Sequence, residues 1–190
     1  WGGTTNSGGG QSTYTNNIIF DPDKSTWFGN FNTAVIDGNI ITKTDGTVTQ
    51  PIIDINNGNH IKITNNLIDG ENLSYSAVRM QNTDYFNISN NSLLGSVSSI
   101  PVVEIGTSTY GAINGNRIIA QGSAQDGILL TATLAIQIVG NTILGGTTGT
   151  TYGVNIATTG TASAIVGNYL QGNTADTLNN GTGGTITANI

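Results

Sequence analysis

Three charged residues of this chain, Asp54, Arg79 and Glu104, follow one another at intervals of 25 residues, and each stands between two apolar residues. Such alternation is typical of a β-strand with one buried face. Stacked strands about 4.8 Å apart would place the two carboxylates about 9.6 Å apart, close to the roughly 6.5–9.5 Å of inverting glycosidases. The pattern therefore allows a general acid and base for glycan hydrolysis. We favour the structural alternative, an ion-pair ladder in which Arg79 neutralises both acids on an exposed sheet face.

A second set with the same spacing consists of His60, Tyr85 and Tyr110, followed by Ala135 and Ala162. Three rings on one outer face can stack on sugar rings, pack against a neighbouring subunit, or form a ladder with one another. His60 is the only histidine and the chain has no cysteine, which is too little for a catalytic triad or a metal site. We therefore predict glycan binding or a subunit contact here, and neither a metal nor a cofactor.

The elements that must position these residues belong to a repeat: an aliphatic residue, a spacer, Asn or Gly, a fixed Asn, a spacer, then Ile or Leu. The fixed asparagines are Asn39, Asn66, Asn91, Asn116, Asn141 and Asn168, with a truncated copy at Asn189 and a degenerate first copy at Asn16–Ile19. Their intervals of 27, 25, 25, 25, 27 and 21 residues indicate a solenoid. We predict a structural ladder in which each Asn amide bonds to its copies above and below.

Each repeat also holds short runs rich in β-branched residues and no helix signal. The residue before the fixed Asn is Gly or Asn in every complete copy, as a left-handed corner between strands requires. Gly70, Gly95, Ala120, Gly145 and Gly172 mark a second corner. The sequence therefore predicts an all-β parallel solenoid of about six to seven rungs, each of roughly 25 residues.

These I-x-[NG]-N-x-[IL] units resemble the repeats of the right-handed parallel β-helix, the pectin-lyase-like fold, over roughly residues 31–190. The resemblance implies a fold rather than one function, because this scaffold carries lyases, hydrolases, epimerases, adhesins and phage tail proteins. The short, Asn-, Gly- and Thr-rich rungs look most like a bacteriophage tailspike or tail-fibre segment. That likeness implies a homotrimer that binds, and sometimes cleaves, bacterial surface polysaccharide.

Composition limits the partners and the organisation. Five Lys and Arg residues and a net charge of −6 exclude binding through nucleic-acid phosphates, and no apolar run is long enough for membrane insertion. We expect residues 1–30 to be an irregular Gly-rich lead-in in which Trp27, Phe28 and Phe31 cap the coil. Residues 31–190 would form the β-helix, which we expect to continue into, or be covered by, another domain or subunit.

Three functions remain open from the sequence. The first is a structural and receptor-binding segment of a tailspike or tail fibre, located in the virion tail, trimeric, and contacting other tail proteins and bacterial surface glycan. The second is a glycoside hydrolase or polysaccharide lyase that uses Asp54 and Glu104. The third is a secreted or surface-anchored bacterial adhesin. The short segments between repeats argue against a deep catalytic groove, so we prefer the first.

Overall fold

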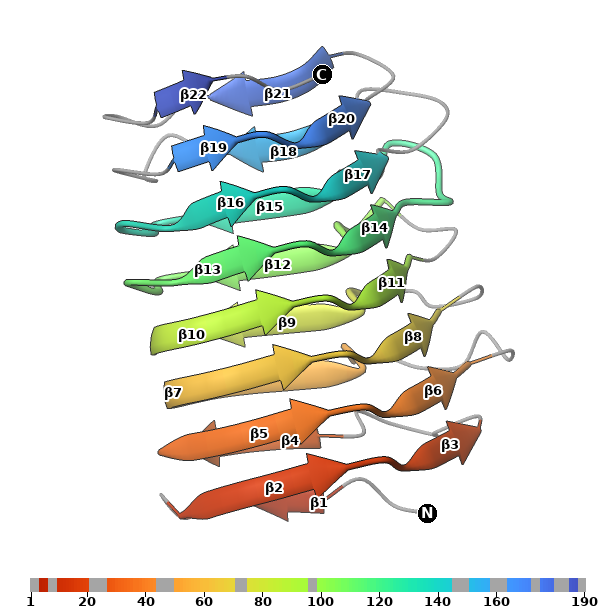
Figure 1. The fold of residues 1–190 in the computed structure, drawn as a ribbon, viewed down its shortest axis with the longest axis vertical. Helices are drawn as coiled ribbons and strands as arrows, with labels where there is room; N and C mark the ends of the chain where they lie inside the picture. The colour runs from red at the N-terminus through yellow and green to blue at the C-terminus, as the bar shows by residue number, and fades with distance from the viewer. Residues whose placement is uncertain are drawn as a thin grey trace.

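The computed structural model describes residues 4–6, 10–20, 27–43, 50–70, 75–95, 99–144, 151–157, 164–171, 175–179 and 185–187. The regular elements within these ranges are all β-strands. Figure 1 shows them stacked in a right-handed coil, with the chain crossing the front from left to right and returning behind as it climbs. This confirms the predicted all-β parallel solenoid. None of the described residues belongs to a helix that is long and apolar enough to cross a membrane.

Every turn contributes three short segments, which form three rows of parallel strands. Row a contains β1 (Thr4–Asn6), β4 (Trp27–Phe31), the first part of β7 (Ile53–Thr64), β9 (Val78–Gln81), β12 (Val103–Gly106), β15 (Ile128–Thr131), β18 (Tyr152–Ile156) and β21 (Ala175–Asn179). Row b contains β2 (Gln11–Thr15), β5 (Thr33–Asp37), the rest of β7, β10 (Thr83–Ser89), β13 (Ala112–Asn114), β16 (Gln137–Val139), β19 (Ala164–Val166) and β22 (Thr185–Thr187). The long strand β7 joins rows a and b into one 15-stranded sheet.

Row c is a separate seven-stranded sheet. Its strands are β3 (Ile18–Phe20), β6 (Ile40–Thr42), β8 (Leu67–Asp69), β11 (Ser92–Leu94), β14 (Arg117–Ile119), β17 (Thr142–Leu144) and β20 (Tyr169–Gln171). Side chains alternate between the inner and outer side along the strands of all three rows. The inward ones are mostly Ile, Val or Leu and are fully buried. Each contributes about 1.5–3 kcal/mol to stability relative to exposure, so the apolar columns hold the coil together.

The corner between rows b and c has the predicted left-handed backbone. Gly38, Gly115, Gly140 and Gly167 have φ values of 62–66°, and Asn65 and Asn90 both have 57°. Gly and Asn are the residues that tolerate this conformation at least cost. The corner explains why the position before the fixed Asn is restricted to these residue types.

The fixed asparagines form the predicted ladder on the inner side of this corner. The side chain of Asn91, for example, donates to the side-chain oxygen of Asn116 at 2.9 Å and to the backbone oxygen of Ile63 at 2.8 Å. Its own side-chain oxygen accepts from the backbone and side-chain nitrogens of Asn66. The same pattern links Asn39, Asn66, Asn91, Asn116, Asn141 and Asn168, all buried. The ladder thus satisfies polar groups within the coil and is structural.

Two further left-handed corners were not predicted. His60, Tyr85, Tyr110 and Ala135 have φ values of 52–55° between rows a and b, and Asn82, Thr107 and Ala132 have 48–50° shortly before them. The sequence predicted the three rings on straight strands, because bulky residues rarely adopt a left-handed backbone. By contrast, Gly70, Gly95 and Ala120 end row c strands without positive φ. Gly145 and Gly172 lie outside the described residues.

The regular coil begins before the predicted boundary at residue 31. Strands β2 and β3 pair in parallel with β5 and β6, and Asn17 donates to the side chain of Asn39. The degenerate copy of the repeat at Asn16–Ile19 is therefore a true turn, because it retains the Asn and the apolar residue that follow the corner. Phe31 is buried. The side chains of Trp27 and Phe28, predicted as a cap, lie outside the described ones, as does Asn189.

Candidate functional site

The predicted charged column exists on the outer side of row a. Parallel register places Asp54 beside Arg79 and Arg79 beside Glu104, and the column continues with Leu129 and Asn155. Arg79 binds Asp54 through two hydrogen bonds, 2.9 Å from its Nε and 2.6 Å from its Nη2. The guanidinium and carboxylate therefore form a bidentate ion pair between adjacent turns.

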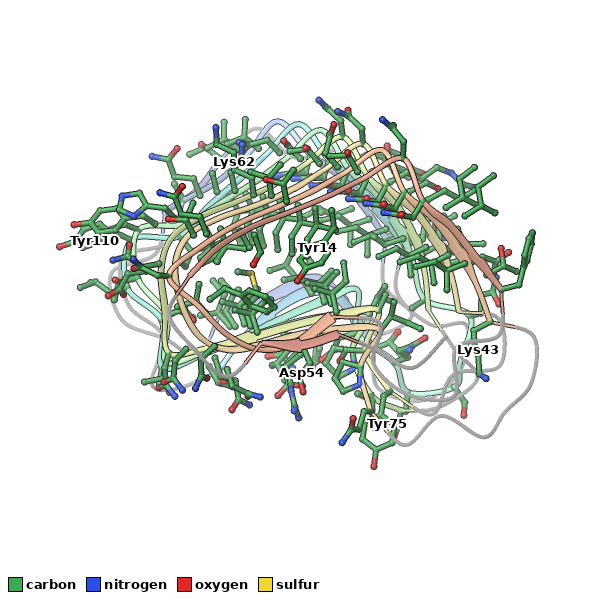
Figure 2. All side chains as sticks on the ribbon, turned by 90° about the horizontal axis from the view of Figure 1, so that it is seen from below. Tyr14, Lys43, Asp54, Lys62, Tyr75 and Tyr110 are labelled. Atoms are coloured by element: carbon green, nitrogen blue, oxygen red, sulfur yellow. The ribbon has the colours of Figure 1, made fainter. Side chains whose placement is uncertain are left out.

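The expectation of an exposed sheet face is wrong for Asp54. Figure 2 shows Asp54 on the outside of the coil, yet its side chain is 0% exposed, whereas that of Arg79 is 27% exposed. A carboxylate that is buried and bound on both oxygens by a guanidinium cannot reach a water molecule or a substrate. The structure therefore does not bring Asp54 and Glu104 together as two accessible carboxyl groups.

Glu104 is the remaining acid of the column and is half-buried. Burial raises the pKa of Glu104, the positive charge of Arg79 opposes this, and the negative charge of Asp54 adds to it. The hydrogen bonds to Asp54 raise the pKa of Arg79. Since Asp54 already neutralises Arg79, Glu104 lies beside a compensated ion pair, and its protonated form is favoured relative to a free glutamate.

A second half-buried acid, Asp126, was missed by sequence reasoning. It accepts hydrogen bonds of 2.8 Å from the side chain of Asn155 and the backbone nitrogen of Tyr152. Burial raises its pKa, and these two hydrogen bonds lower it. Asp126 stands three residues before Leu129, a member of the charged column. Its connection to that column is the hydrogen bond from Asn155. No other turn has an acid at the position of Asp126, so the repeat did not point to it.

The aromatic column lies at the corner between rows a and b. His60 and Tyr85 stack with ring centroids 5.2 Å apart, and Tyr85 and Tyr110 with centroids 5.3 Å apart. Tyr85 and Tyr110 are 52% and 53% exposed, and Figure 2 shows Tyr110 projecting from the edge of the coil. Because both faces of Tyr85 are covered by its neighbours, a sugar ring cannot stack on it. Unstacked faces remain only at the two ends of this ladder.

The described residues contain no group of three or more His, Asp or Glu side chains that could hold a metal ion. The described surface offers proton transfer at the half-buried acids Glu104 and Asp126, hydrogen bonding, and aromatic contact at the ladder.

Several solved structures share this fold. The A-module of the mannuronan C-5 epimerase AlgE6 of Azotobacter vinelandii matches with a TM-score of 0.58 and 20% identity, over 94% of this chain and 56% of that one. The A-module of AlgE4 from the same organism matches with a TM-score of 0.60 and 18% identity, over 92% and 57%. The periplasmic alginate epimerase AlgG matches with a TM-score of 0.67 and 16% identity, over 94% and 44%.

These likenesses show a shared parallel β-helix fold. The chain spans about half the length of the structures it matches. The neighbours found are alginate epimerases rather than the phage tail proteins that the sequence resemblance favoured. No protein-family model and no curated protein matches the chain.

Proposed function

We propose that this chain is part of a carbohydrate-active β-solenoid enzyme in which Glu104 donates a proton to a bound glycan. The observation that carries the proposal is the environment of Glu104: a half-buried carboxyl group of raised pKa on the outer face of row a, next to Arg79. The fold shared with epimerases that act on mannuronan and alginate supports a carbohydrate substrate.

The proposed step is general acid catalysis. Protonated Glu104 transfers its proton to the glycosidic oxygen as the bond from that oxygen to the anomeric carbon breaks, and Glu104 is left as a carboxylate. A water molecule from solvent adds to the anomeric carbon and releases one proton to solvent, which leaves a new reducing end. The adjacent positive charge of Arg79 stabilises this carboxylate. Asp54 holds Arg79 in place through the bidentate pair, so Asp54 is a positioning residue and does not react.

The charge of the chain favours an uncharged or weakly charged substrate. The whole sequence has five Lys and Arg residues and a net charge of −6, and Arg79 is already neutralised by Asp54. An acidic polymer such as mannuronan would meet repulsion on this surface. We therefore expect the substrate to differ in charge from those named for the similar structures.

The test is glycan cleavage by the wild type and by Glu104→Gln, measured as new reducing ends on neutral polysaccharides and on alginate. We expect Glu104→Gln to lower the rate by about 100-fold or more, the usual contribution of a general acid, with no fall in melting temperature. The matched variant Asp126→Asn, another half-buried acid, reports whether any loss is specific to Glu104. Undiminished cleavage by Glu104→Gln would refute the assignment.

A second candidate is a glycan-binding segment without catalysis, as in a trimeric phage spike or fibre or in a bacterial adhesin. The exposed Tyr110 favours it, because it ends the aromatic ladder with one unstacked face and large exposed aromatic side chains are typical of contact surfaces. Under this alternative the wild type cleaves no glycan, and substitution of Glu104 does not change glycan binding. The number of chains in the assembly then distinguishes a trimeric spike or fibre from a monomeric adhesin.

A further inference from the structure

A shallow pocket of about 320 Å³ lies at the corner where row a turns into row b. It is enclosed by the end of β4 and the residue after it, the middle of β7, and the residue after β9. The lining residues are Asn30, Phe31, Asn32, Asn57, Gly58, Asn59 and Asn82. The pocket is distinct from the charged column, and of its residues only Phe31 was named from the sequence, as part of a cap.

The lining is uncharged and combines apolar surface with amide groups. Five of its side chains are asparagine amides, each with one acceptor oxygen and two donor hydrogens. Asn57 donates to the side-chain oxygen of Asn30 at 2.9 Å, which orients this pair. The side-chain oxygen of Asn59 is buried and has no hydrogen-bond partner among the described residues. A buried acceptor of this kind gains a partner when its amide turns toward a donor from a ligand.

The chain places an imidazole directly after the last of the β7 residues that line the pocket. His60 follows Asn59 directly, and its ring stacks on Tyr85 on one side. The register between β5 and β7, in which Ala34 pairs with Ile61, places the small side chain of Thr33 on the other side. One face of the imidazole therefore has no ring stacked on it. An unstacked ring face beside several amides suits a molecule with both an apolar C–H face and hydroxyl groups.

We propose that this pocket binds one uncharged sugar residue of a glycan. Its hydroxyls donate to Asn59 and exchange hydrogen bonds with Asn57 and Asn82, while its C–H face lies against His60. The absence of a charged group from the lining disfavours a uronic acid, whose carboxylate would lack a cationic partner. The proposal rests on the proposed function for its choice of a glycan as the ligand.

The position of the pocket fits a glycan that also reaches the charged column. Asn82 stands three residues after Arg79 in the chain, about 10 Å along an extended strand. A glycan lying along the outer side of β9 would thus extend from the surroundings of Glu104 to the pocket. The pocket would hold a sugar residue away from the bond that reacts.

The test measures binding of neutral oligosaccharides by calorimetry, using oligomers of glucose, galactose, mannose, rhamnose and N-acetylglucosamine, with oligomannuronate as the acidic comparison. We expect saturable binding of at least one neutral oligomer. Asn59→Ala and Asn82→Gly should each weaken it by about tenfold, the effect of losing one or two hydrogen bonds. Glycine is chosen at Asn82 because φ is 49° there, so the amide is removed without strain.

Matched controls separate loss of the pocket from damage to the coil. Asn90→Gly makes the same change at another exposed left-handed corner, with φ of 57°, and Asn114→Ala removes an amide from the outer side of β13. Both should bind with affinity within about twofold of the wild type. Failure of every neutral oligomer to bind, tighter binding of oligomannuronate, or unchanged affinity in both pocket variants would overturn the proposal.

The two proposals fail separately. If Glu104→Gln retains cleavage while the pocket variants lose binding, the catalytic assignment falls and the pocket remains. If Glu104→Gln abolishes cleavage while the pocket variants bind normally, only the pocket falls. Glu104→Gln itself should bind the neutral oligomer as the wild type does, since Glu104 does not line the pocket.

Discussion

At the residue scale, the charged column shows how one contact changes the role of a side chain. Asp54 and Glu104 have equivalent places in the repeat, two turns apart. Arg79 binds Asp54 through both carboxylate oxygens. For Glu104, the charge of Arg79 only partly offsets the rise in pKa that burial causes. One acid is consequently locked in an ion pair, while the other is left able to exchange a proton.

The raised pKa of Glu104 predicts a pH-dependent difference in stability. Between the ordinary value of 4.5 and the raised pKa, the folded state binds the proton more tightly than the unfolded state. The free energy of unfolding therefore falls as pH rises through this window. Glu104→Gln removes the effect, so its stability relative to wild type should increase with pH by at most about 1 kcal/mol, given the partial exposure. Urea unfolding at several pH values measures this.

Asp37 supplies a control of opposite sign. Hydrogen bonds from Thr64 and Asn65 lower its pKa below 3.8, so its contribution is present above that value and is lost as pH falls through the lowered pKa. Asp37→Asn should therefore lose stability relative to wild type as pH rises from the lowered pKa to the ordinary value of 3.8, with no further change above that window. If the free energy of unfolding changed with pH in the same way for both variants, the pH dependence would come from other titrating groups and not from these two carboxyl groups.

At the element scale, the sequence predicted those corners whose backbone demands a particular residue type. Gly or Asn before the fixed Asn signals a left-handed corner, and the structure has one at each of these described positions. The aromatic corner gave no such signal, because Tyr85 and Tyr110 are poor residues for that conformation. The pocket was not predicted, although Asn30, Asn57 and Asn82 lie in one column, because the next turns have Thr107 and Ala132 there instead of a fixed residue type.

The Asn ladder predicts a large effect of one substitution in the middle of the coil. Asn116→Ala removes the oxygen that accepts from both the backbone and side-chain nitrogens of Asn91. The backbone nitrogen of Asn91 then has no partner, and its side-chain nitrogen keeps only the bond to Ile63, at about 1–3 kcal/mol for each lost bond. We expect a loss of about 3 kcal/mol or more in the free energy of unfolding, measured in urea. Asn114→Ala, on the outer surface of the same turn, should change it by less than about 0.5 kcal/mol.

At the scale of the whole molecule, stacking explains why the fold was predictable while the function was not. Each turn contacts only its neighbours, so a constant interval of about 25 residues determines the register of every row. Function depends instead on departures from the repeat, such as the Arg79–Asp54 pair, Asp126, and the asparagines around the pocket. The periodicity predicted which residues lie side by side, as in the column of Asp54, Arg79 and Glu104. It could not tell which of them is buried in an ion pair.

The outer side of row c carries an apolar surface that bears on the predicted homotrimer. Ile18, Ile40 and Leu67 stack in register, and Ile18 and the nearby Phe20 are 64% and 72% exposed. Exposed apolar side chains in one patch are typical of a protein–protein contact. We therefore expect the chain to self-associate through row c, with a trimer as the product, as the resemblance to phage spikes implied.

Light scattering of the purified chain, with and without SDS, measures this association. The double variant Ile40→Lys and Leu67→Lys places two charges at outward positions on the apolar surface of row c. It should convert a trimer into a monomer with little change in melting temperature. The matched variant Thr142→Lys and Ser92→Lys adds the same charges to other turns of the same column and should remain trimeric. A wild-type monomer would remove the fibre-like assembly and leave a monomeric enzyme or adhesin, in which Glu104 and the pocket act within one chain.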